Sequence, residues 1–202
     1  MKIAALTGAG VSKASGVPTF VEMGDLREKL SRSYYNSHPI EFYQILNGMR
    51  TVTEAANPNP AHIALAIKHI PIVTMNIDGL HHKAGSTEEE VIEIHGSLRK
   101  VYCPKCSKWY PFSVTEESIK CSKCIDVILQ PDIVLYGDSI PRLQDSINLV
   151  SNVDLLLVIG TSFYTSTATY VSEAAKNAGV RVEIINENAE ELVPKLLANN
   201  DS

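Results

Sequence analysis

The sequence lacks an excess of positive charge and any hydrophobic run long enough to cross a membrane. Its 18 Lys and Arg stand against 23 Asp and Glu, a net charge of −5, so the basic surface typical of nucleic-acid-binding domains is missing. The apolar start at residues 1–6 is too short for a secretory signal, and later runs fall below the about 20 residues of a spanning helix. These absences exclude nucleic-acid-binding and membrane-spanning classes and predict a cytoplasmic protein.

Cysteine is also scarce, and the few copies are not scattered. The four cysteines form two pairs, Cys103-Pro-Lys-Cys106 and Cys121-Ser-Lys-Cys124. Each CxxC turn can present two thiolates to one ion, so the pairs predict a single Zn²⁺ rather than disulfides. Because all four ligands are cysteines, no coordination position remains for a substrate, and the zinc is expected to be structural. A redox pair or buried free thiols are the alternatives.

The remaining composition is that of a globular protein, with 45% hydrophobic and 20% charged residues. Short apolar or β-branched runs alternate with helical patterns, which predicts parallel strands joined by right-handed crossovers. The expected strands cover residues 2–6, 71–74, 91–94, 129–136, 153–159 and 180–185. Helices are expected over 40–52, 61–69, 139–151 and 167–178, with a break at Tyr34-Tyr35 and His38-Pro39. The prediction is an α/β fold: a Rossmann-like parallel sheet with helices on both faces, over 1–100 and 127–202, and a small zinc-ribbon insertion at 101–126.

Polar or glycine-rich groups follow most of the expected strands. They are Gly8-Ala9-Gly10, Asn76 with Asp78, His95, Gly160-Thr161-Ser162 and Asn186. Since carboxyl ends of parallel strands meet at one sheet edge, these groups predict one ligand crevice, although each alone could be an ordinary turn. The first glycines are not spaced as in the usual dinucleotide fingerprint, because Lys13 stands at the third glycine position. His62 is expected to be a packing or capping residue rather than a ligand.

The order of these motifs resembles that of the sirtuin family, and the resemblance spans nearly the whole chain. The motifs are GAGVSKASGVPTF, NPAHIAL, TMNIDGLHHKAG, IHGSL, the two CxxC pairs, LQPDIVLYGDSIP, VIGTS and IIN. The resemblance implies a Rossmann-like domain with a zinc ribbon. It also implies NAD-dependent removal of acyl groups from protein lysines, with release of nicotinamide and O-acyl-ADP-ribose.

The resemblance also implies roles for individual residues. Cofactor-binding positions would be Gly8, Ala9, Gly10, Ser12, Pro18, Phe20, Asn76, Ile77, Asp78, Gly160, Thr161, Ser162 and Asn186. Asn76 would act at the ribose and His95 would be the general base, a role that suits an imidazole near neutral pH. The backbone of Val134, Leu135, Tyr136 and Gly137 would pair with an extended acylated substrate peptide. Residues 21–56 would form a flexible loop and helical segment over the NAD site.

Several positions depart from the family pattern, mostly at the NAD site. Met75 replaces a Gln, Val21 replaces an Arg, and residues 163–167 lack the usual Val and Pro. Gln130 and Asp138 replace an Arg and a Glu. These changes leave two alternatives to a deacylase: an ADP-ribosyltransferase or NAD glycohydrolase, and an NAD- or ADP-ribose-binding module with little turnover. Retention of His95 favours the deacylase. The sequence leaves the acyl group, the protein substrate and the oligomeric state open.

Overall fold

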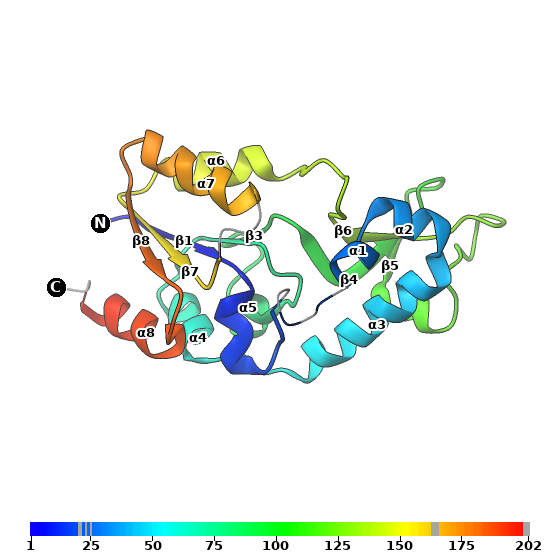
Figure 1. Ribbon diagram of the computed structural model, residues 1–202, viewed down its shortest axis with the longest axis horizontal. Helices are drawn as coiled ribbons and strands as arrows, with labels where there is room; N and C mark the ends of the chain where they lie inside the picture. Colours follow the sequence, from blue (N-terminus) through cyan, green and yellow to red (C-terminus); the bar gives the residue numbers. More distant parts are fainter. Residues whose placement is uncertain (20–21, 23, 25, 163–165, 200–202) are drawn as a thin grey trace.

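A five-stranded parallel sheet forms the centre of the larger of two units (Figure 1). The computed structural model describes residues 1–19, 22, 24, 26–162 and 166–199. The strand order is β3-β2-β1-β7-β8. The strands are β1 (Ile3–Thr7), β2 (Ile72–Thr74), β3 (Val91–Glu93), β7 (Leu155–Ile159) and β8 (Arg181–Ile185). The predicted parallel sheet is therefore confirmed, with boundaries that differ from the prediction by one or two residues.

Helices cover both faces of this sheet, as predicted (Figure 1). One face carries α4 (Pro60–Ile67) and α8 (Ala189–Asn199), and the other carries α6 (Leu143–Val150) and α7 (Ser166–Asn177). Successive side chains of β7 point to opposite faces of the sheet. All five are buried because helices cover both faces. Leu157 packs into the core shared with α4 and α8, whereas Val158 packs into the core shared with α7. Every helix among the described residues is too short or too polar to span a bilayer.

The start of α4 shows why its local sequence forms a helix. The Asn59 side chain accepts a hydrogen bond from the Ala61 N–H at 3.0 Å, and Pro60 occupies the first turn, where a missing N–H costs nothing. His62 accepts a bond from the Asn59 N–H through Nδ1 at 3.3 Å, which completes a capping box. The prediction that His62 is a capping or packing residue is confirmed.

The smaller unit consists of residues 26–55 and 96–135. Its antiparallel sheet has the order β5-β4-β6, with β4 (Gly96–Tyr102), β5 (Trp109–Pro111) and β6 (Gln130–Ile133). Against it pack α1 (Leu26–Lys29), α2 (Arg32–Ser37), α3 (Pro39–Ala55) and the 3₁₀ helix η2 (Phe112–Glu116). Tyr35, Phe42 and Tyr43 share one buried core with Val101 and Leu129. Segment 26–55 is thus joined to the cysteine-bearing segment through a common hydrophobic core.

Two expectations of local structure were wrong, and two short helices were not predicted. The chain breaks at His38, between α2 and α3, but Tyr34 and Tyr35 lie inside α2. The strand expected over 129–136 among the parallel strands ends at Ile133, and it pairs antiparallel with β4 instead of joining the parallel sheet. The 3₁₀ helix η1 (Ala9–Ser15), which follows the turn after β1, and α5 (Leu80–Lys83) were not among the expected helices. These elements are short, so their hydrophobic periodicity is too brief to be recognised in the sequence.

Candidate active site and metal centre

The groups that follow the parallel strands meet at one edge of the sheet. The glycine turns after β1 and β7 are in direct contact, since the Gly10 N–H donates to the Gly160 carbonyl at 2.8 Å. Gly160 has a φ of +62°, and a Cβ there would lie 2.1 Å from the Val11 nitrogen. No residue with a side chain fits that position. The glycines predicted to bind the cofactor are therefore also required for the two turns to pack together.

Ser12 is the centre of a buried polar network behind this edge. Its side chain is fully buried, and its hydroxyl donates to the Asp78 carboxylate at 2.7 Å. The same hydroxyl accepts from the Asn76 amide at 3.1 Å and lies 3.4 Å from His62 Nε2. The network brings together three of the predicted cofactor residues, Ser12, Asn76 and Asp78, and one residue expected to be structural, His62.

Asn76 and Asp78 have fixed orientations because their backbones and side chains are held at several points. The Asn76 N–H donates to the Thr74 hydroxyl at 3.1 Å, and its side-chain amide donates to the Gly8 carbonyl at 3.2 Å. Asp78 accepts from the Leu80 N–H at 2.9 Å, which places its carboxylate at the start of α5. Pre-positioned amide and carboxylate groups suit recognition of a polar ligand, because no side-chain ordering is needed on binding.

His95 lies in the two-residue turn between β3 and β4, where the chain leaves the larger unit. Its Nδ1 is 3.2 Å from the Met75 carbonyl, which can only accept, so we assign the ring proton to Nδ1. Nε2 is then unprotonated and accepts from the Thr167 hydroxyl at 3.2 Å. Burial lowers the pKa of His95 below its usual value, against a smaller opposing effect of the Met75 hydrogen bond. The ring is therefore neutral at pH 7 and can accept a proton at Nε2.

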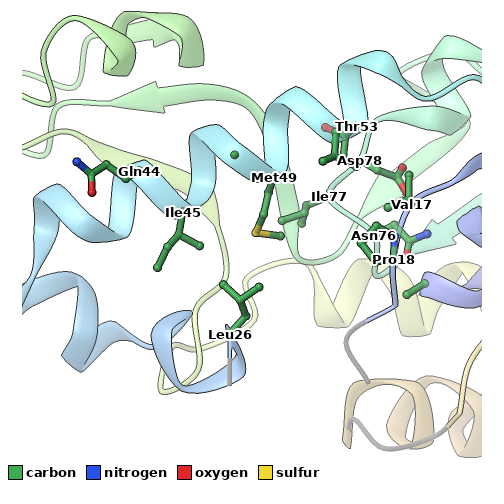
Figure 2. Close-up of a pocket in the computed structure, with 13 residues that line it drawn as sticks. Val17, Pro18, Leu26, Gln44, Ile45, Met49, Thr53, Asn76, Ile77 and Asp78 are labelled. Atoms are coloured by element: carbon green, nitrogen blue, oxygen red, sulfur yellow. The ribbon is translucent and has the colours of Figure 1, made fainter. Parts of the chain in front are cut away.

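Ile77 lines several cavities, and two of them divide most of the predicted residues between them. One, of about 350 Å³, is lined by Ala9, Pro18, Asn76, Ile77 and Asp78 together with residues of α3 (Figure 2). The other, of about 470 Å³, includes His95 and all four residues predicted to bind a substrate peptide, Val134, Leu135, Tyr136 and Gly137. Ile77 lines both. The predicted cofactor and substrate groups thus occupy adjoining spaces.

Several backbone groups in the predicted peptide-binding segment already form hydrogen bonds within the protein. The Val134 N–H donates to the His95 carbonyl at 2.9 Å, and the Tyr136 N–H donates to the Leu30 carbonyl at 3.1 Å. The Tyr136 carbonyl accepts from the Arg32 N–H at 3.0 Å, which makes a parallel bridge with Ser31. Pairing with a peptide over the whole segment would compete with these bonds.

Arg32 ties α2 to the wall of the His95 cavity. Its guanidinium binds Asp138 in a bidentate pair at 2.9 and 2.7 Å and donates to the Gln130 amide oxygen at 2.6 Å. These two partners are the positions at which the sequence departs from the family's Arg and Glu. A guanidinium is present between them, but it is supplied by Arg32 of α2 instead of by position 130 in β6.

A side-chain contact connects two strand ends on the adenosine side of the predicted site. The Thr161 N–H donates to Asn186 Oδ1 at 3.0 Å, which connects the ends of β7 and β8. Neither cavity is lined by Gly160, Thr161, Ser162 or Asn186. Phe20, Val21 and residues 163–165 lie outside the described residues.

The four cysteines form a cluster that fits one zinc ion. Their sulfur atoms all lie within 4.8 Å of one another, and Cys106 Sγ is 3.9 Å from Cys121 Sγ. Tetrahedral coordination with Zn–S bonds of about 2.3 Å requires sulfur separations of about 3.8 Å. The Lys123 N–H donates to Cys121 Sγ at 3.4 Å, as expected for a thiolate with support from the surrounding backbone. The cluster can therefore bind the predicted structural ion.

Three residues at the site could not be found from the sequence alone. Thr167 contacts His95 from the first turn of α7, and Arg32 reaches the cavity wall from α2. His81 is 2.9 Å from the Thr7 hydroxyl, which in turn donates to Thr74. His81 lies within the TMNIDGLHHKAG motif, but the motif assigned it no role, and Thr167 and Arg32 lie outside the quoted motifs. Each contact joins residues far apart in sequence, so only the folded chain reveals it.

Comparison with known proteins identifies relatives across most of the chain. A sequence model of the Sir2 family matches residues 8–166. A Bacillus cereus protein described as an NAD-dependent protein deacetylase is 38% identical over 92% of this chain and 81% of its own length. A protein of the same description from Caldivirga maquilingensis is 36% identical over 90% of this chain and 76% of its own length.

Solved structures agree with the sequence comparison. A Sir2 complex with a p53 peptide and NAD⁺ superposes with a TM-score of 0.87 at 28% identity, covering 99% of this chain and 93% of that one. A Sir2 complex with the inhibitor EX-527, 2′-O-acetyl-ADP-ribose and a deacetylated p53 peptide gives a TM-score of 0.86 at 28% identity, covering 99% and 94%.

Proposed function

Because the chain belongs to the Sir2 family, we propose that it is an NAD-dependent protein-lysine deacylase that releases nicotinamide and O-acyl-ADP-ribose. One observation carries the proposal. The predicted cofactor residues around Asn76 and the predicted base His95 line two cavities that share Ile77. A reaction between a bound cofactor and an acyl-lysine needs two such spaces to adjoin.

The smaller cavity suits the nicotinamide end of NAD. The Asn76 amide and the Asp78 carboxylate offer polar groups at one end of an otherwise apolar space, which fits a flat ring that carries an amide. NAD, when bound, supplies a ribose carbon from which nicotinamide can leave. The part of this chain is to hold Asn76 and the glycine turns in place, through the bonds centred on Ser12.

His95 has the protonation state that a general base needs. Its Nε2 faces the cavity that holds the predicted peptide segment, and its only partner among the described residues is the Thr167 hydroxyl. That hydroxyl can rotate away when a ribose hydroxyl arrives. Nε2 then accepts the ribose proton, while the Met75 carbonyl stabilises the ring by accepting from Nδ1.

The substrate peptide is proposed to pair mainly at Gly137. The Val134 and Tyr136 amides are committed to His95 and Leu30. Gly137 lies at the end of the segment and lines the cavity with His95. This position would bring an acyl-lysine side chain toward Nε2 while the strand-like wall stays intact.

The state of the four cysteines supports both a bound zinc ion and a cellular location for the protein. All four cysteines are unpaired thiols within reach of one ion, a state maintained in a reducing compartment. We therefore place the protein in the cytoplasm, with one structural zinc that has no part in the chemistry.

Nicotinamide release tests this function. The zinc-loaded protein is incubated with NAD⁺, with and without a mixture of acyl-lysine peptides, and His95→Ala is compared with His69→Asn. His69 is an exposed histidine at the opposite edge of the sheet, and Asn tolerates its φ of +49°. Release that requires peptide and is lost only in His95→Ala supports the deacylase. Release without peptide supports a transferase or glycohydrolase, and binding without release supports a binding module.

A further inference from the structure

The outermost strand of the parallel sheet, β8, has an unpaired edge (Figure 1). It pairs with β7 on one side, and among the described residues no strand pairs with it on the other. Figure 1 shows this edge on the side of the larger unit that faces away from the smaller unit. None of residues 180–185 lines either cavity assigned to the proposed reaction. The edge has no part in that function, and an open strand edge is a template for pairing with another chain.

The backbone groups on this edge are fixed by the pairing of β8 with β7. The Arg181 N–H donates to the Asp154 carbonyl just before β7 at 3.2 Å, and the Ile185 carbonyl accepts an N–H from just after β7 at 2.9 Å. Alternate residues of a strand direct their backbone groups to the same side, so these two residues and the one midway between them point toward β7. The N–H and C=O groups of Val182 and Ile184 therefore point outward, and they form no hydrogen bond with another described residue.

The side chains of β8 alternate between the two faces of the sheet. Val182 and Ile184 lie on the face that α7 covers, and Ile184 is 53% exposed. Arg181 and Glu183 lie on the opposite face, where the guanidinium and the carboxylate are 3.3 Å apart. Both of these side chains are exposed, by 59% and 39%. The open edge thus carries two opposite charges, two residues apart, and an exposed apolar residue.

The order of these charges makes the edge complementary to itself. Charged side chains on a strand edge commonly prevent pairing with other chains. Two copies of β8 that meet antiparallel across a twofold axis at Val182, however, bring each Arg181 directly opposite Glu183 of the other copy. Opposite charges in facing positions stabilise such a pair, and like charges destabilise it. An axis at Glu183 would instead set two carboxylates against each other, so the charges select the register centred on Val182.

We propose that β8 pairs with β8 of a second copy of this chain, which joins the two parallel sheets into one continuous sheet. The Val182 backbone groups of the two copies bond to each other, and the Ile184 N–H donates to the Val180 carbonyl of the other copy. The Ile184 side chain then faces that Val180. On the opposite face, the two Arg181 and two Glu183 side chains form a group of four alternating charges.

Sedimentation velocity over a range of protein concentrations tests this assembly. The unmodified chain should approach twice the monomer mass of 22.1 kDa as concentration rises, and added salt should weaken the dimer by screening its exposed charges. Arg181→Glu replaces two favourable charge pairs by two repulsive ones and should raise the dimer Kd at least about tenfold. Lys120→Glu is the matched control, because it reverses one charge of an exposed ion pair with Asp126 in the smaller unit. A monomer at every concentration would overturn the proposal and leave the edge for an extended segment of another protein.

Charge reversal at both positions tests the register. Glu183→Arg alone should also prevent pairing, whereas Arg181→Glu combined with Glu183→Arg in one chain exchanges the charges and should restore it. An equimolar mixture of the two single variants should form a heterodimer, because every facing pair is then of opposite sign. That heterodimer would also show that each single variant is folded. Dimers of Arg181→Glu alone with unchanged Kd, or a mixture that stays monomeric, would contradict the proposal.

Amide hydrogen exchange locates the contact on the backbone. The Val182 and Ile184 N–H groups should exchange at least about tenfold more slowly in the dimer than in the monomer. The Glu183 N–H points toward β7, so its exchange should not depend on concentration. In Arg181→Glu, the two outward amides should keep the fast rate of the monomer at every concentration. A dimer in which neither outward amide slows would place the interface elsewhere and rule out pairing at β8.

Discussion

The larger and smaller units of this protein are assembled in opposite ways. In the larger unit, short strands follow one another through the chain, and the predicted site groups come directly after a strand, as Asn76 does after β2. In the smaller unit, α2 and α3 reach across the chain to share a core with β4 and β6. The local sequence therefore predicts the site residues of the larger unit. The packing of the smaller unit, in contrast, is seen only in the folded structure.

The two units also differ in what holds them together. The parallel sheet is buried on both faces, and β7 is completely enclosed. The smaller unit is a three-stranded sheet whose core includes Cys103 and Cys121. A small core of this kind usually needs additional cross-links to be stable. We therefore expect four changes to affect the two units differently. They are removal of the metal, replacement of the predicted base, a lower pH and the loss of an ion pair.

The largest expected effect is removal of zinc, by chelation or by Cys121→Ser. Structural zinc contributes about 10 kcal/mol or more to folding of small metal-binding modules. We expect hydrogen-exchange protection to be lost in β4, β6 and α3 but retained in β1 and β7, with activity abolished. Lys105→Ala, an exposed change within the first CxxC turn, is the control. Equal loss of protection in both sheets would show that the two units do not unfold separately.

Replacement of His95 by Ala should have the next largest effect, and it should lower the catalytic rate without lowering stability. Loss of a general base lowers kcat by about 10² to 10⁴, while the thermal midpoint should change little, because His95 is partly exposed. Thr167→Val should lower activity far less, since Thr167 contacts the base without carrying the proton. A similar loss of kcat in His95→Ala and in Thr167→Val would contradict the assignment of His95 alone as the general base.

Acid should destabilise the larger unit selectively. Burial is the main cause of the lowered pKa values of His62, His81 and His95, so the folded protein keeps all three neutral. Below about pH 6.5 the unfolded chain binds protons that the folded chain does not, and stability falls by up to about 1.4 kcal/mol per histidine per pH unit. Urea unfolding between pH 7.5 and 5.5 measures the slope. His95→Ala should reduce the slope, and a slope equal to that of the unmodified protein would contradict this assignment.

The smallest expected effect is that of Arg32→Ala, which breaks a partly exposed pair between α2 and the cavity wall. The side chains of Arg32 and Asp138 are 31% and 20% exposed, so the loss of global stability should be about 1 kcal/mol or less. The KM for peptide should rise a few-fold, with kcat unchanged, because the wall carries the proposed peptide contacts. Arg32→Lys should restore only part of the effect, because a Lys cannot form the bidentate pair. A change in kcat without a change in KM would contradict this role.

The sequence predicted the larger unit well because its signals are local. Apolar runs gave the strands, and the residues after them gave the glycine turns, Asn76 and His95. The CxxC spacing gave the cysteine cluster. What the sequence missed depends on contacts between distant segments: Thr167 with His95, Arg32 with Asp138, and α2 and α3 with the antiparallel sheet. Such contacts leave no periodic pattern in either segment, so propensity and spacing cannot reveal them.

The junction between His95 and Gly96 has a consequence for how such a chain can evolve. Gly96 has a φ of +76°, and a Cβ there would lie 1.9 Å from the Asp132 carbonyl, so this position is closed to every other residue. The Val134 N–H holds the His95 carbonyl from the returning strand. The segment between β4 and β6 is therefore fixed at both of its ends beside His95, at Gly96 and at the Val134 N–H. Changes of length or sequence within that segment are expected to leave the imidazole in place.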